Sequence, residues 1–89
     1  MIKFKTIVNP FTQSILVSAR VNKVSCETIL NYDSLDEWSE FVFEGKTFDI
    51  HILYEGELTI SIYEVTGLSV ADYQAPQPVD IKVVHKDEF

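Results

Sequence analysis

Several residue types are scarce in this sequence, and each scarcity excludes a class of protein. The 89 residues contain one cysteine, Cys26, so no internal disulfide framework can form, and a reducing compartment such as the cytoplasm is favoured. The three glycines all fall at expected turns, which leaves no glycine-rich loop to hold a phosphate group. No apolar run has the length of a signal peptide or a membrane span, so we expect no membrane association.

Positive charge is also scarce, and it is unevenly placed. Fourteen acidic residues stand against seven lysines and arginines, for a net charge of −7. Residues 1–23 hold four cations and no acid, whereas residues 24–72 hold eleven acids and Lys46 alone as a cation. An acidic segment of this kind serves solubility, and it also suits a surface that meets a basic partner. It argues against nucleic-acid binding, which needs clustered lysine or arginine.

The strongest positive signal is a period of two in the middle of the chain. Hydrophobic residues make up 46% of the sequence, enough for one globular domain over residues 1–89. Between Ser39 and Val65 they recur at every second position, as a half-buried strand requires. We therefore predict a three-stranded antiparallel meander. Its inner face consists of Phe41, Phe43, Phe48, Ile50, Ile52, Leu58, Ile60 and Ile62.

Two glycines set the register of this meander. A turn at Gly45-Lys46 places Phe43 opposite Phe48, whereas a turn at Glu44-Gly45 places Phe43 opposite Lys46. We prefer the first, because it keeps an aromatic ring away from a cation.

At the second glycine, a three-residue loop of Tyr54, Glu55 and Gly56 with a bulge places Ile52 opposite Leu58 and Ile50 opposite Ile60. A two-residue loop would put apolar and polar residues on the same face.

The flanking segments predict further strands and one short helix. Strands are expected over residues 2–8, 13–21 and 24–31, with Cys26 buried on the apolar side of the third. Ser34 followed by Glu37 is a capping-box pattern, which predicts a helix near Ser34–Ser39. Residues 68–73 form either a short helix or irregular structure. A last edge strand is expected at about residues 79–85, with Val79, Ile81 and Val83 on one face and a frayed tail over residues 86–89.

These elements define the expected fold class. It is all-β or β-dominated α+β, a small antiparallel barrel or sandwich of six or seven strands with the meander at its centre and the one short helix. The element order is similar to that of an OB-fold, a class that often binds single-stranded nucleic acid. That similarity is one of topology alone, and the charge distribution argues against the function.

Few residues suggest chemistry. His51, expected opposite Glu40, is the one candidate for acid–base catalysis or metal binding, and a surface ion pair is the simpler interpretation. Cys26 has no indicated base or oxyanion site. We therefore expect no catalytic residue, no metal site and no cofactor, and we do not expect an enzyme.

The outer face of the meander is the candidate interaction surface. It combines acids with outward apolar residues, a pattern typical of protein interfaces. We predict a small acidic binding or regulatory module with a protein partner, and a basic partner would complement its charge. The alternative is a structural subunit that self-assembles into a homo-oligomer through its sheet edges. An acidic mimic of nucleic acid ranks below both. The candidate residues are Trp38, Glu40, Glu44, Asp49, His51, Leu53, Glu55, Glu57 and Tyr63.

Overall fold

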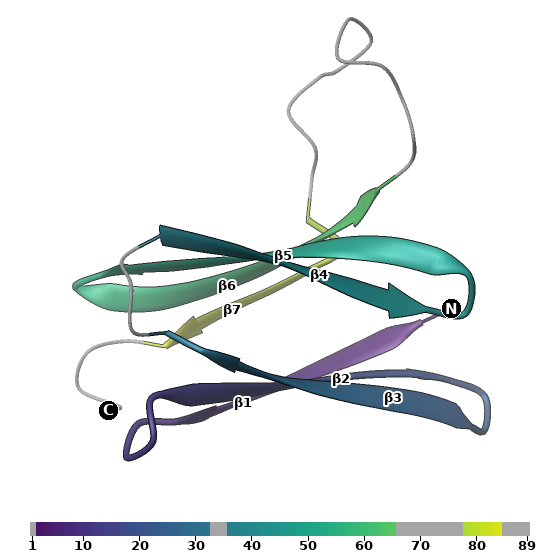
Figure 1. Cartoon of the computed structure of the whole chain (residues 1–89), viewed down its shortest axis with the longest axis horizontal. Helices are drawn as coiled ribbons and strands as arrows, with labels where there is room; N and C mark the ends of the chain where they lie inside the picture. Colours follow the sequence, from purple (N-terminus) through teal and green to yellow (C-terminus); the bar gives the residue numbers. More distant parts are fainter. Residues whose placement is uncertain (1, 33–35, 66–77, 85–89) are drawn as a thin grey trace, which may run out of the picture.

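The computed structural model describes residues 2–32, 36–65 and 78–84, and these form two antiparallel sheets (Figure 1). The first sheet has the order β1-β2-β3 and the second the order β4-β5-β6-β7. The strands are β1 (Lys3–Asn9), β2 (Ser14–Val21), β3 (Val24–Asn31), β4 (Asp36–Phe43), β5 (Lys46–Glu55), β6 (Glu57–Val65) and β7 (Asp80–Val84). The β-dominated class is therefore confirmed.

The two sheets lie one above the other and share a single hydrophobic core (Figure 1). The first sheet contributes Ile15, Val17 and Ala19 of β2, all with no exposed area. Across the described residues the sheets remain separate ladders, so the arrangement is a sandwich and not a closed barrel. The second sheet contributes the larger share of the core, from Phe41, Phe43, Phe48, Ile50, Ile52, Leu58, Ile60 and Ile62. The predicted inner face of the meander is thus confirmed.

Aromatic contacts join the sheets at two places. Phe4 of β1 meets Phe48 of β5 edge-to-face, with ring centroids 5.1 Å apart. Tyr32, which follows β3, meets Tyr54 of β5 in the same geometry at 5.5 Å. Burial raises the pKa of the Tyr32 hydroxyl, and the Tyr54 hydroxyl nearby raises it further. Edge-to-face pairs stabilise a core by about 0.5–1.5 kcal/mol beyond their buried area.

The preferred register of the first meander turn is wrong. Glu44 and Gly45 are the turn residues, Phe41 lies opposite Phe48, and Phe43 lies opposite Lys46. Both turn residues have positive φ, 53° and 72°, as a type I′ turn requires. This turn matches the right-handed twist of the strands, which offsets the strain of a left-handed glutamate.

The pairing of Phe43 with Lys46 is harmless because the lysine charge is neutralised elsewhere. Lys46 Nζ lies 3.3 Å from the carboxylate of Glu64 on β6.

The second turn is tighter than predicted. Gly56 alone separates β5 from β6, with φ of 78°, and Glu55 lies opposite Glu57. Ile52 therefore faces Ile60 and Ile50 faces Ile62, a shift of two residues from the expected pairs. Because side chains alternate with period two, this shift leaves every residue on its predicted face. The tighter turn also pairs β-branched residues with each other at the centre of the sheet.

The predicted helix near Ser34–Ser39 is wrong where it can be tested. Asp36 to Ser39 belong to β4 and pair with β5, whereas residues 33–35 lie outside the described residues. One helical turn is intrinsically weak, and extension of the ladder brings Trp38 opposite His51 instead. The uncertain segment 68–73 and the expected tail 86–89 also lie outside the described residues.

One further expectation about burial is wrong. Cys26 is exposed, because the opposite sheet does not cover the first half of the edge strand β3. On β7, Asp80 and Lys82 face inward, opposite Ile62 and Ile60, and the intervening Ile81 and Val83 face outward. The expected last strand is present as Asp80–Val84 at the sheet edge, and its alternation did not indicate which of its two faces is the inner one.

Replacement of one buried isoleucine tests the assignment of faces. We expect Ile52→Ala to lower the free energy of unfolding by about 2–5 kcal/mol, because Ile52 has no exposed area. Val42→Ala is the control, since Val42 is 58% exposed and should change stability by less than about 0.5 kcal/mol. Urea unfolding followed by tryptophan fluorescence measures both. If both substitutions lowered the free energy of unfolding equally, the assignment of Ile52 to the core and Val42 to the surface would be wrong.

Replacement of the left-handed glutamate tests the first turn. We expect Glu44→Asn to raise the free energy of unfolding by about 0.5–1 kcal/mol, because asparagine tolerates positive φ in a type I′ turn. Asparagine is disfavoured within strands, so Glu27→Asn in β3 should lower stability. A loss of stability in Glu44→Asn would instead support the Gly45-Lys46 turn.

Candidate protein-binding face

The outer face of the second sheet gathers nearly all the residues predicted for interaction. We call it the acidic face and define it by the outward positions of β4 to β7. These include Asp36, Trp38, Glu40, Val42, Asp49, His51, Leu53, Glu55, Glu57, Tyr63, Val65, Ile81 and Val83. Of the predicted residues, Glu44 alone lies elsewhere, in the first turn. The placement of the others is a structural fact, and their role in binding stays a prediction.

An aromatic cluster lies on this face. Trp38 stacks on His51, its partner across the ladder, with ring centroids 4.3 Å apart and planes at 19°. Tyr63 of β6 lies beyond, with its ring 5.8 Å from that of Trp38. Cross-strand pairs of this kind stabilise a sheet by roughly 0.2–1 kcal/mol. The cluster is therefore held in place while Trp38 remains 58% exposed.

His51 has a different partner from the one predicted. Its Nε2 lies 2.6 Å from Oδ1 of Asp36, and Glu40 lies opposite Asp49 instead. Because a carboxylate only accepts, we assign the proton of this hydrogen bond to Nε2. Asp36 thus orients the imidazole ring under Trp38. Sequence reasoning missed Asp36 because the capping pattern placed it in a helix.

The charges on the acidic face are all of one sign. Among the described residues, its outward positions carry five carboxylates and neither lysine nor arginine. Glu40 and Asp49 lie directly opposite one another across the ladder. Like charges in that position destabilise a sheet. The face therefore keeps an internal repulsion that a cation from outside would relieve.

Apolar residues extend this face beyond the predicted set. Val42, Val65, Ile81 and Val83 are all exposed. Ile81 and Val83 were missed because alternation on a five-residue edge strand does not reveal which side faces the core. The described part of the chain thus presents an acidic surface with an aromatic centre and aliphatic margins.

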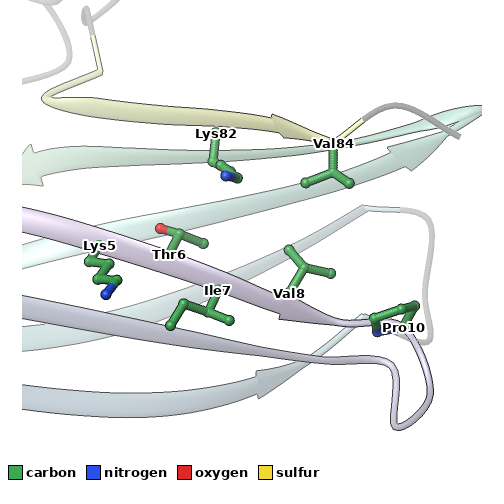
Figure 2. A pocket seen from close by; sticks show the side chains of 7 residues that line it. All are labelled: Lys5, Thr6, Ile7, Val8, Pro10, Lys82 and Val84. Atoms are coloured by element: carbon green, nitrogen blue, oxygen red, sulfur yellow. The ribbon is translucent and has the colours of Figure 1, made fainter. Parts of the chain in front are cut away.

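A cavity of about 380 Å³ lies between the edge strands β1 and β7, where the sandwich is open (Figure 2). Its lining residues are Lys5, Thr6, Ile7, Val8, Pro10, Lys82 and Val84. Thr6 Oγ1 is buried and has no hydrogen-bond partner among the described residues. Among the described residues, the lining contains no carboxylate, imidazole or thiol.

The same part of the chain has neither a cluster of metal ligands nor a membrane-spanning helix. Residues 2–32, 36–65 and 78–84 contain no group of three or more His, Cys, Asp or Glu side chains placed to hold a metal ion. Nor does any helix in these ranges have the length and apolarity needed to cross a membrane.

Comparisons with known proteins do not assign a family. No protein-family model matches the chain, and neither curated proteins nor solved structures give a match.

Asp80 supplies a pH-dependent test of its inward position on β7. Burial raises the pKa of this carboxyl above its ordinary value of 3.8, and Lys82 partly opposes the change. A raised pKa means that the ionised form costs stability, and this cost appears as the pH rises through the folded-state pKa. We expect Asp80→Asn to have a higher Tm than the native chain at pH 7 and an equal Tm at pH 3.

Thermal unfolding by circular dichroism measures this difference. Glu27→Gln, at an exposed position of β3, is the control, and the difference between its Tm and that of the native chain should not depend on pH. If the Tm difference between Asp80→Asn and the native chain were the same at both pH values, the carboxyl would not be buried.

Proposed function

We propose that this chain is a small, non-catalytic binding or regulatory module that contacts a basic protein through its acidic face. One observation carries the proposal: Glu40 lies opposite Asp49 on a face that holds no lysine or arginine among the described residues. If these acids served solubility alone, a lysine beside them would make the sheet more stable. The repulsion is instead retained, and departures of this kind from local rules are typical of functional sites.

The aromatic cluster supports the same proposal. Binding energy concentrates in a few exposed aromatic and arginine residues, and rigid ones lose little entropy on binding. Trp38 meets both conditions, because its ring is exposed and already stacked on His51. His51 is in turn oriented by Asp36. The partner would then place lysine or arginine over the acids and an apolar or cationic group on the Trp38 ring.

Two other features bear on compartment and assembly. We propose the cytoplasm, because the exposed free thiol of Cys26 would be open to oxidation elsewhere. Self-assembly through sheet edges is the second candidate function. In the described part of the chain β1, β3, β4 and β7 each have one unpaired edge, and unpaired edges accept further strands.

Substitution of Trp38 tests the binding role. Peptides selected from a random 12-residue display library against the native chain should be rich in lysine and arginine. Their affinity should fall roughly 30-fold in Trp38→Ala, as for a central interface tryptophan. Stability should change by less than about 1 kcal/mol, because the side chain is largely exposed. Titration calorimetry at 50 mM and 500 mM salt measures the affinities.

A second substitution separates charge from folding. Glu40→Lys turns the repulsive pair with Asp49 into an attractive one, so it should raise stability slightly while it weakens peptide binding. Ile29→Ala, on the outer face of the other sheet, is the control and should leave binding unchanged. Selected peptides without basic residues, or affinities unaffected by Trp38→Ala and Glu40→Lys, would contradict the proposal.

A further inference from the structure

The outer face of the first sheet also has a distinct composition. We call it the basic face and define it by the exposed or half-buried outward positions of β1 to β3. Its charged residues are the cations Lys3, Lys5 and Arg20 and the single acid Glu27, a net charge of +2. Lys3 lies directly opposite Arg20, another like-charge pair across a ladder. The two faces of the sandwich thus carry repulsive pairs of opposite sign.

An aliphatic row crosses the basic face. Ile7, Leu16 and Ile29 occupy one outward row across all three strands. Ile29 is 71% exposed and Ile7 is 47% exposed. Exposed large apolar residues therefore lie on both outer faces, one beside acids and the other beside charges that are mostly positive. Contiguous apolar residues rimmed by charge are typical of protein interfaces.

We infer that the occupant of the acidic face includes a second copy of this chain, which docks through its basic face. The inference rests on the proposed binding role of the acidic face and names its partner. Lys3 and Arg20 of one copy would neutralise Glu40 and Asp49 of the next, and the aliphatic row would meet apolar residues of the acidic face. Each like-charge pair would then be relieved by the other.

This geometry determines the kind of assembly. Because the interacting faces lie on opposite sides of one sandwich, the contact is heterologous and extends into head-to-tail stacks. The basic face measures about 25 Å by 14 Å from the strand rise and spacing. A contact of several hundred Å² per partner is at the low end for protein interfaces, so the dissociation constant should be on the order of 10–100 μM.

Analytical ultracentrifugation of the full chain tests the inference. At 50 mM salt the average mass should rise above the monomer mass of 10.2 kDa as the concentration increases to several hundred micromolar. Higher salt, 500 mM, should reduce this association. The double variants K3E/K5E and E40K/D49K each reverse charges on one face. Each alone should weaken association at least 10-fold.

A mixture of the two variants is the decisive sample. The intact acidic face of K3E/K5E should bind the intact basic face of E40K/D49K, and the two altered faces, whose reversed charges are opposite in sign, should also attract each other. Equal amounts should therefore reach an average mass of at least twice the monomer mass at concentrations where neither variant associates alone, although both variants remain net negative. Lys23→Glu, in the turn between β2 and β3, is the control and should associate like the native chain. Circular dichroism confirms that each variant is folded.

Three outcomes would overturn the inference. They are a native chain that stays monomeric at every concentration, association that survives both reversals, and reversals whose effects the mixture does not rescue. The first leaves the proposed binding module standing if the selected basic peptides still bind. The second indicates contact through sheet edges. The third indicates a contact between identical faces.

Discussion

The apolar contact between the two sheets is the constraint on which the rest of the structure depends. The fully buried side chains of β2 pack in one layer with the isoleucines of β5 and β6. Because side chains alternate along a strand, burial of one set commits every neighbouring side chain to the outside. The acids and the Trp38 cluster therefore share a surface without any further interaction to bring them there. Their gathering on one face follows from which side chains the core buries.

The same alternation explains how much of the fold could be predicted. A period of two is visible in a single sequence, so the inner face of the meander could be assigned to the correct side. Register is less visible, because a shift of two residues changes no face. At Gly56 the tighter turn pairs Ile50 with Ile62 and Ile52 with Ile60 at the centre of the ladder. At Gly45 the type I′ turn matches the strand twist, and Lys46 pairs with Glu64, a residue eighteen positions away.

The sequence predicted which meander residues lie on the acidic face better than it predicted which of them are in contact. Outward acids and aromatics of the meander follow from alternation, so most members of the face could be named from the amino-acid order, whereas Asp36, Ile81 and Val83 could not. The pairing of His51 with Asp36 could not, because a local capping pattern competed with a ladder whose benefit is non-local. For Cys26 the predicted side of the strand was correct and the predicted burial was wrong. Its pattern indicates the core side of β3, and its exposure depends on how far the opposite sheet reaches.

The inward charges of β7 have a consequence for how the chain behaves at high concentration. A flat apolar strand at the margin of a sheet is a template for fibril growth, and proteins counter this by turning charged side chains inward there. Asp80 and Lys82 occupy those inward positions on β7. A foreign strand that added to this margin and extended the core would have to bury against a carboxylate and an ammonium group. The inward charges therefore oppose strand addition at this margin, although Ile81 and Val83 of β7 face solvent.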